Sequence, residues 1–314
     1  MQFISAQDIN ATLSWKTAIE ALERGHQGAR PLGDQYFIGD GAFGLFSRGV
    51  ILPGYGAGIK LASIYPQNVQ AQPPLPAEHA AFVVFDQKTK AVTAILDGPA
   101  ITCFKTAADS ALASQYLSRP DSHTLLVIGA SPVARALVQA HLQVRPGISE
   151  VLLWNRSAEK LYPLLDSLKQ QGINASIAPD LATAVSRADI ISTATSATSP
   201  VIKGSWVKPG THIDLVGGYR PDMQEADGAL LQKARIFVDD RAAALLSGDI
   251  AIPLQSGEIS EQQIEADLFE LCQGSDHQRT DGDITVYKNA GGAHLDLMIS
   301  QCVIDLLQGG LMPG

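Results

Sequence analysis

The first hundred residues combine one helical pattern with several short apolar segments. Between residues 8 and 29, Ile9, Leu13 and Leu22 recur at the spacing of one face of an amphipathic helix. The following residues are rich in glycine, proline and aromatic residues, which indicates strands and turns. Strands are predicted at 35–38, 44–47, 50–52, 58–64, 80–86 and 92–97, with a hairpin turn at 87–90 between the last two. This part therefore predicts a helix packed on a mainly antiparallel sheet.

The pattern changes near residue 100. Thr102 is expected to cap a helix that runs to about Leu117, and the polar residues 118–121 form a break. Short apolar strands then alternate with helices, which is typical of a parallel sheet. Strands are predicted at 124–128, 150–154, 174–177, 188–192, 212–216 and 235–239, and helices at 132–144, 157–171, 180–186 and 293–310. The fold class is therefore α/β, with a Rossmann-type doubly wound parallel sheet beside an α+β domain.

Composition excludes several classes of protein. The 314 residues are 46% hydrophobic and 18% charged, which suits about two globular domains. The net charge of −9 argues against nucleic acid or an anionic membrane as a partner. The N-terminus does not resemble a signal peptide, and no apolar run is long enough to span a bilayer. Cys103, Cys272 and Cys302 show neither zinc spacing nor a disulfide framework, so we expect a cytoplasmic protein without a metal.

The segment that follows residue 124 predicts a dinucleotide site. A Rossmann fingerprint, G-x-G-x-x-G/A, needs small residues for a tight turn and for close approach to the pyrophosphate. Here Gly129, Ser131 and Ala134 occupy those positions, and Pro132 suits the first turn of the next helix. The alternative is a strand–helix turn that binds no nucleotide. The candidates at this turn are Gly129, Ala130, Ser131, Pro132 and Val133.

The end of the second strand bears on the choice of cofactor. An NAD enzyme usually has an acid there, whereas this chain has Asn155, Arg156 and Ser157. Arg156 and Ser157 are suited to a 2′-phosphate, which favours NADPH and leaves NADH as the alternative. A solvated surface arginine is the other interpretation of Arg156. Further cofactor-binding candidates are Thr193, Ala194, Thr195, Val216, Gly217 and His294, the last expected to cap the final helix near the nicotinamide.

Motifs along almost the whole chain occur in an order that resembles the ornithine cyclodeaminase/μ-crystallin family. They are Gly58–Leu61 with Pro66 and Asn68, Phe85-Asp86, Leu96–Gly98, Thr102–Ser110, the turn at Gly129, Trp154–Ser157, Ala188–Ser192, Gly204, Trp206–Gly210, His212–Gly217, Arg220–Asp222 with Glu225, Val238-Asp239 and Ser247–Asp249. The resemblance implies a homodimer of two-domain subunits. Residues 1–117 and 297–314 would bind substrate and form the dimer, residues 118–296 would bind the cofactor, and the active site would lie in the cleft between them.

The family includes cyclodeaminases, alanine dehydrogenases, ketimine reductases and thyroid-hormone-binding proteins. Where the cyclodeaminases have an aspartate after V-G-G, this chain has Tyr219, and its surroundings are similar to the reductases of Δ1-pyrroline-2-carboxylate and Δ1-piperideine-2-carboxylate. The resemblance therefore implies NADPH-dependent reduction of a small anionic cyclic imine to L-proline or L-pipecolate, in proline metabolism and hydroxyproline degradation. Ornithine cyclodeamination and non-catalytic binding of NADP or a small ligand are the alternatives.

The candidate catalytic residues are Lys60, Lys105, Asn68 and Tyr219. Lys60 lies in an apolar strand and Lys105 at a helix start, and both are expected to hold the substrate carboxylate. Lys105 replaces a family arginine, and the position of a second family arginine falls near Gly33, so no residue is assigned there. The alternatives are a solvated edge-strand lysine for Lys60, a turn residue for Asn68 and a packed interface residue for Tyr219.

Overall fold

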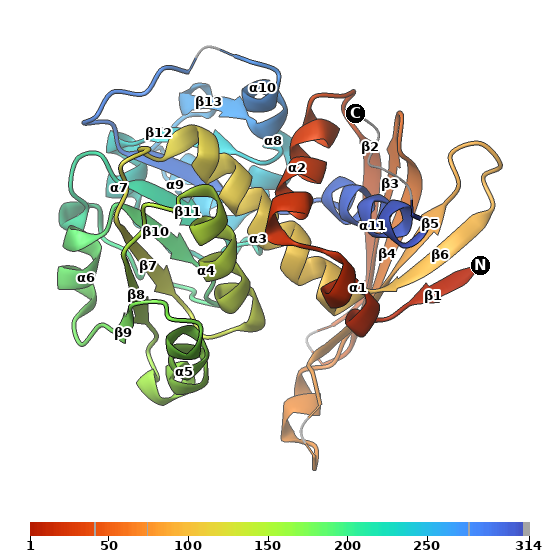
Figure 1. Cartoon of the computed structure of the whole chain (residues 1–314). Helices are drawn as coiled ribbons and strands as arrows, with labels where there is room; N and C mark the ends of the chain where they lie inside the picture. Colours follow the sequence, from red (N-terminus) through yellow and green to blue (C-terminus); the bar gives the residue numbers. More distant parts are fainter. Residues whose placement is uncertain (41, 74, 276, 310–314) are drawn as a thin grey trace. The chain divides into compact units, whose positions relative to one another are not determined.

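The computed structural model of the chain describes residues 1–40, 42–73, 75–275 and 277–309. The chain forms two compact units, which are best followed in Figure 1 by their colours. The N-terminal unit comprises residues 1–105 together with the segment that begins at Gly292. The Rossmann unit comprises Thr106–Gly291. The domain boundaries expected from the sequence lie about a dozen residues later at the first junction and five residues later at the second, at 117/118 and 296/297.

A six-stranded sheet forms the frame of the N-terminal unit, in the order β1-β6-β5-β4-β3-β2. Every neighbouring pair is antiparallel except β1 with β6, which confirms the predicted mainly antiparallel sheet. The two segments expected at 44–47 and 50–52 are one continuous strand. The strands are β1 (Gln2–Ile4), β2 (Leu32–Gly39), β3 (Gly44–Leu52), β4 (Gly56–Ile64), β5 (Glu78–Phe85) and β6 (Val92–Asp97).

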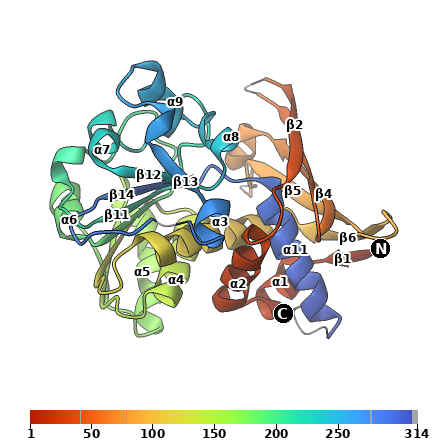
Figure 2. The same ribbon diagram turned by 90° about the horizontal axis from the view of Figure 1, so that it is seen from above.

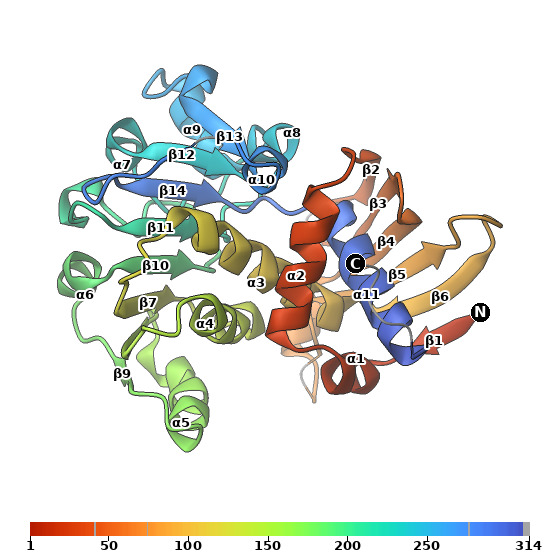
Figure 3. The same ribbon diagram turned by 45° about the horizontal axis from the view of Figure 1, so that its top comes forward.

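Helices cover one face of this sheet. The last helix, α11 (Ala293–Leu307), packs on β3, β4 and β5 and against α2 (Trp15–His26), as Figure 3 shows. The single N-terminal helix expected at 8–29 is wrong: α1 (Ala6–Thr12) ends at Leu13, and α2 begins after Ser14. The Ser14 side chain accepts a hydrogen bond from the Thr17 amide and so starts a new helix, which the apolar spacing does not reveal.

The helix α3 (Gly98–Leu117) begins four residues before the predicted cap at Thr102. The Asp97 carboxylate accepts from the Ala100 amide at 2.9 Å, so Asp97 caps the helix. Thr102 instead lies inside the helix, where its hydroxyl donates to the Gly98 carbonyl at 2.8 Å. The division between the two units falls within this helix, after Lys105.

The Rossmann unit is built on an eight-stranded sheet in the order β13-β12-β14-β11-β10-β7-β8-β9. All seven neighbouring pairs are parallel, as the alternating pattern predicted. The strand order reverses between β7 and β10, and in open α/β sheets ligands bind at the carboxyl ends of the strands at such a point. The strands are β7 (Thr124–Ile128), β8 (Glu150–Trp154), β9 (Ala175–Ile177), β10 (Ile190–Thr193), β11 (His212–Leu215), β12 (Arg235–Val238), β13 (Ile264–Asp267) and β14 (Thr285–Lys288).

Helices lie on both faces of this sheet, as Figure 2 shows from above. Alternate residues of β7 serve two separate cores: Leu125 and Val127 pack with α4 and α5, and Leu126 and Ile128 pack with the helices of the opposite face. This is the double covering that a parallel sheet requires. The helices are α4 (Pro132–Val144), α5 (Tyr162–Gln170), α6 (Leu181–Arg187), α7 (Gly228–Lys233), α8 (Arg241–Ala244), α9 (Gly248–Gln255) and α10 (Leu268–Cys272).

Several of these elements were not predicted. The helix expected at 157–171 is a 3-10 turn, Ala158–Leu161, followed by the shorter α5. The strands β13 and β14 and the helices α7 to α10 were missed, because they are short and carry polar residues such as Lys288 inside the core. In the described part of the chain, no helix is both long enough and apolar enough to cross a membrane.

Candidate functional site: a dinucleotide pocket and a lysine pair

The turn after β7 has the geometry that a dinucleotide requires. Gly129 has a φ of +129°, and a Cβ there would lie 2.5 Å from the Ala194 carbonyl oxygen, so glycine is required. Ser131 is the N-cap of α4, and Pro132 begins the helix as expected. The Ser131 hydroxyl oxygen accepts from the Ala134 amide at 3.2 Å. Its own proton therefore remains available to a phosphate beside the free N–H groups of the helix.

A cavity of about 720 Å³ extends from this turn along the carboxyl ends of β7, β8 and β10. Eight of the predicted cofactor residues line it, whereas Pro132, Val133, Thr193, Val216 and Gly217, in the same unit, are not among its lining residues. The eight are Gly129, Ala130, Ser131, Asn155, Arg156, Ser157, Ala194 and Thr195. Its size and its position at the point of strand reversal fit a dinucleotide.

The end of the cavity beside β8 is basic. Arg156 and Lys160 both line it, and its described lining contains no carboxylate. The Asn155 side chain donates to the Ser157 carbonyl at 2.9 Å and so fixes the bend that carries these residues. The sequence analysis missed Lys160, which a search one helical turn beyond Arg156 would have found.

Three of the predicted cofactor residues, Thr193, Thr195 and Gly217, are held by one buried carboxylate, that of Glu225. Its Oε2 accepts from the Thr193 hydroxyl and from the Gly217 amide, each at 2.6 Å. Its Oε1 accepts from the amide and hydroxyl of Thr195 at 2.8 and 2.7 Å. Thr193 thus supports the wall of the cavity through Glu225. Burial raises the pKa of Glu225, and the neighbouring charge of Asp249 acts in the same direction, whereas Lys288 and the threonine hydroxyls oppose this shift.

Asp249 extends this arrangement into an ion pair. Its Oδ1 accepts from the Glu225 amide at 2.6 Å, and its Oδ2 lies 3.0 Å from Nζ of Lys288. The side chains of Asp249 and Lys288 are both fully buried. Asp249 therefore connects the start of α9 to β14 through an ion pair, and to the segment that carries Glu225 through a hydrogen bond.

In the N-terminal unit, the ammonium groups of the two predicted lysines both lie near the carboxylate of Asp296. Nζ of Lys60 is 3.6 Å from Oδ1 of Asp296, and Nζ of Lys105 is 4.0 Å from Oδ2. Lys60 also donates to the Thr102 hydroxyl at 2.6 Å. All three charged side chains are largely buried. The two lysines therefore lie near each other, and the edge-strand alternative for Lys60 is wrong, because β4 lies between β3 and β5. Asp296 was missed, although an acid in the first turn of the apolar final helix is a visible signal.

The other predicted residues are Asn68, Tyr219 and His294. Asn68 lies in the 3-10 turn Pro66–Gln70, where its side chain donates to the Pro76 carbonyl at 3.0 Å. Tyr219 is 61% exposed on the loop after β11. His294 does not cap α11, because Gly292 is the N-cap and no side chain caps this end. Its ring meets that of His26 edge-on at 5.6 Å, and burial holds its pKa well below the usual range.

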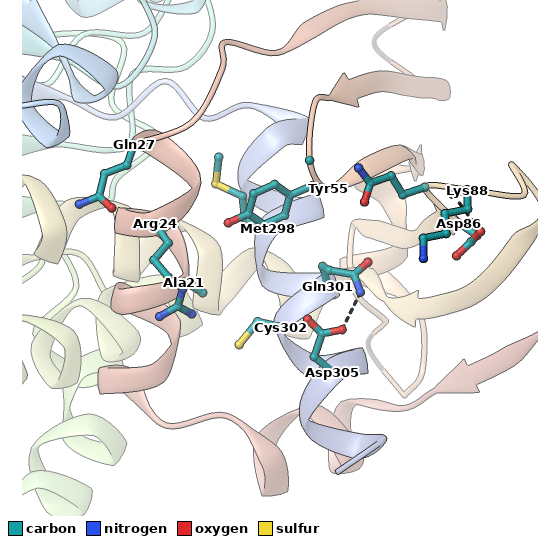
Figure 4. A pocket seen from close by; sticks show the side chains of 12 residues that line it. Ala21, Arg24, Gln27, Tyr55, Asp86, Lys88, Met298, Gln301, Cys302 and Asp305 are labelled. Carbon is teal, nitrogen blue, oxygen red and sulfur yellow. Dashed lines mark hydrogen bonds between the residues drawn. The ribbon is translucent and has the colours of Figure 1, made fainter. Parts of the chain in front are cut away.

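A second cavity, of about 630 Å³, lies in the N-terminal unit and contains none of the predicted site residues. Figure 4 shows Arg24 on α2 and Gln301 and Asp305 on α11 lining it, with a hydrogen bond of 2.8 Å from Gln301 to Asp305. Among the described residues, no group of three histidine, cysteine or acidic side chains lies close enough to hold a metal ion.

These features define an enzyme with a Rossmann-type nucleotide unit and a second unit that holds a cationic pair. A sequence profile of the ornithine cyclodeaminase/mu-crystallin family matches residues 51–310, and the chain belongs to this family. It is 42% identical over 312 residues to the Δ1-pyrroline-2-carboxylate reductase of Paracoccus denitrificans, with 98% of each chain covered.

Solved structures give the same result. The Δ1-pyrroline-2-carboxylate reductase of Thermococcus litoralis, in complex with NADH and L-proline, superposes with a TM-score of 0.91 at 29% identity and full coverage of both chains. An archaeal alanine dehydrogenase dimer with bound NAD superposes with a TM-score of 0.90 at 27% identity, covering 98% of this chain and 96% of the other. The predicted family and fold class are confirmed. The protein is a nicotinamide-dependent oxidoreductase of the kind that reduces imines.

Loss of the buried ion pair should weaken the Rossmann unit. We expect Lys288→Met to lower the free energy of unfolding by about 3–5 kcal/mol, because Asp249 would remain buried without its cation. Denaturant unfolding checks this value. The double variant Lys288→Met with Asp249→Asn should recover part of the loss, and Lys16→Met, at an exposed position, is the control. A single variant as stable as the wild type would contradict the role of the pair.

Proposed function

We propose that the protein reduces Δ1-pyrroline-2-carboxylate to L-proline with NADPH, and accepts Δ1-piperideine-2-carboxylate as a second substrate. The observation that carries this proposal is the pair of buried ammonium groups, Lys60 and Lys105, on the single carboxylate of Asp296. Two ammonium groups close to a single acid suit the recognition of a small monocarboxylate. The reductases named above support the choice of ring.

The residues of the N-terminal unit bind and orient the substrate. The Lys60 ammonium has three N–H donors and uses one of them on Thr102, so it can also donate to a substrate carboxylate. The imine nitrogen is protonated before reduction, because an iminium carbon accepts a hydride far better than a neutral imine. When bound, the reduced nicotinamide supplies that hydride to C2, and the C=N electron pair becomes the lone pair of the amine. Asn68 and Tyr219 are proposed to contact the ring.

Ornithine cyclodeamination is the second candidate function, because the family includes it. That reaction uses an acid where this chain has Tyr219, and the tyrosine favours the reductase. Ammonia release from ornithine in the presence of NAD⁺ would support the cyclodeaminase. Tight cofactor binding without turnover of any imine or amino acid would support a non-catalytic binding protein.

The choice of NADPH rests on the basic end of the nucleotide cavity. Arg156 and Lys160 both line it, beside Ser157, and no described carboxylate there is placed to accept the ribose 2′-hydroxyl. Two cations and a hydroxyl suit a 2′-phosphate.

A homodimer is proposed on the exposed face of the N-terminal sheet. The strand register places six large apolar side chains on the face opposite the helices, and they are between 46% and 69% exposed. They are Leu32, Tyr36, Ile38, Leu45, Ile51 and Leu61. An apolar surface of this kind marks an association site, and a second copy of the chain is the proposed occupant. The alanine dehydrogenase that superposes on this chain is a dimer.

The activity is tested by NADPH consumption with the five- and six-membered imine acids. We expect turnover by the wild type and a rise in KM of about 10- to 100-fold in Lys105→Ala, because a charge-assisted contact to the carboxylate is lost. Lys16→Ala, on the surface of the same unit, is the matched control. An enzyme inert toward a panel of cyclic imines would disprove the proposed reaction, and unchanged kinetics in Lys105→Ala would remove that role for Lys105.

Cofactor preference is tested with Arg156→Gln. The dissociation constant of NADPH should rise about tenfold or more while that of NADH stays within about twofold, because only NADPH carries the extra phosphate. Fluorescence titration measures both constants. Arg187→Gln, at an exposed position of the same unit, serves as control. Equal weakening of both cofactors, or no change in either, would reject recognition of the 2′-phosphate by Arg156.

The dimer is tested by light scattering after gel filtration. We expect the wild type to have twice the mass of one chain, and Leu45→Asp with Leu61→Asp to be monomeric, because two charges would be buried against apolar side chains. Tyr162→Asp changes an exposed aromatic residue of the Rossmann unit and should remain dimeric. A monomeric wild type, or a dimeric double variant, would contradict this interface.

A further inference from the structure

One row of side chains crosses the N-terminal sheet on the face that carries the final helix. In the antiparallel register, Gln35 of β2 pairs with Arg48 of β3, Arg48 pairs with Lys60 of β4, and Lys60 pairs with Phe82 of β5. Directly paired residues lie on the same face of a sheet, with Cβ atoms about 4.5–5.5 Å apart. Phe82 is fully buried, so this face is the one that α11 covers. Arg48 therefore stands beside Lys60 on the inner face.

Neighbouring groups of the same sheet orient the guanidinium of Arg48. Its Nε and Nη2 both donate to Oε1 of Gln35, at 3.1 and 2.6 Å. Its Cζ lies 5.4 Å from the centre of the Phe46 ring, a cation–π distance. Gln35 thus fixes the direction of the guanidinium plane through a neutral amide oxygen. Arg48 is half-buried.

The charges of Arg48 and Lys105 act on the same neighbour. Both lower the pKa of His294, in addition to the larger effects of burial and His26. His294 lies two residues before Asp296 in the first turn of α11, and Asp296 is the acid on which Lys60 and Lys105 meet. Strand pairing therefore places Arg48 beside Lys60. Because Arg48 and Lys105 both act on His294, Arg48 also lies in the neighbourhood of Lys105.

We propose that Arg48 is a third carboxylate ligand in this unit and supplies the bidentate contact that the two lysines cannot make. This inference rests on the proposed function, because it assigns a ligand for the acid group of the same substrate.

The chemistry of the two cation types supports the assignment. A lysine ammonium acts as a point charge, whereas a guanidinium presents parallel N–H groups that match the two oxygens of a carboxylate. The resemblance implies arginines at the position of Lys105 and at or beside Gly33, and residues 32–34 and 105 of this sequence contain none. Arg48 lies on the strand next to Gly33 and restores a planar donor to this face. Arg48 on β3 would thus provide the carboxylate recognition that an arginine on β2 would otherwise provide.

The experiment compares two planar ligands that cannot accept a hydride, pyrrole-2-carboxylate and pyrrole-2-carboxamide. Calorimetry on the cofactor-loaded enzyme gives both dissociation constants. We expect the wild type to prefer the acid, and Arg48→Gln to reduce that preference by about 10- to 100-fold. KM for the imine acid should rise by a similar factor, while kcat changes by less than about threefold. Arg48→Lys, which keeps the charge and loses the fork, should fall between the two.

The control is Arg24→Gln, an arginine of the same unit that lines the other cavity in Figure 4 and should leave the preference unchanged. Cofactor affinity and the unfolding midpoint of each variant report whether the fold is intact. If Arg48 only supports the sheet, both ligands will weaken equally and the acid-to-amide ratio will stay the same, which overturns the inference. A wild type that binds neither ligand also overturns it. A wild type that prefers the acid but reduces no imine would disprove the proposed reaction. The acid-to-amide preference of Arg48→Gln would then still decide whether Arg48 binds the carboxylate.

Discussion

The carboxylate of Glu225 is the group on which the cofactor end of the Rossmann unit depends. It is fully buried, and it accepts hydrogen bonds from the ends of two adjacent strands through Thr193, Thr195 and Gly217. A buried carboxylate is tolerated only when its oxygens are satisfied, so the strand ends are constrained to converge on it. Asp249 then positions the Glu225 backbone and brings a buried cation, Lys288, to the same place. Buried charged groups thereby hold the strand ends beside the nucleotide cavity in place.

In the N-terminal unit, the largely buried ammonium groups of Lys60 and Lys105 both lie near one acid, Asp296. At 3.6 and 4.0 Å, neither contact with Asp296 has the short geometry of a full hydrogen bond. Asp296 therefore acts on the two ammonium groups mainly through its charge, and Lys60 is held in addition by the Thr102 hydroxyl at 2.6 Å.

The sequence was sufficient for features that repeat or that follow from one residue's conformation. Strand alternation predicted the parallel sheet, and Gly129 with Pro132 predicted the strand–helix turn. Ser14 and Asp97 cap two helices that begin at positions different from those predicted. The spacing of apolar residues does not reveal a side chain's hydrogen bond to a nearby amide. The partners of buried charges were also out of reach. Asp296 is 236 residues from Lys60 along the chain, and only the fold brings the two together.

The departure from glycine at Ser131 has a physical consequence for the cofactor. Its hydroxyl oxygen takes up the Ala134 amide, which is one of the N–H groups that a helix N-terminus offers to a phosphate. The hydroxyl proton can return one donor to the ligand, but as a neutral group on a rotatable bond. The helix end alone is therefore a weaker anion site than in a fingerprint with glycine there. The positive charge that a phosphate would meet in this cavity comes also from Arg156 and Lys160, which line its far end.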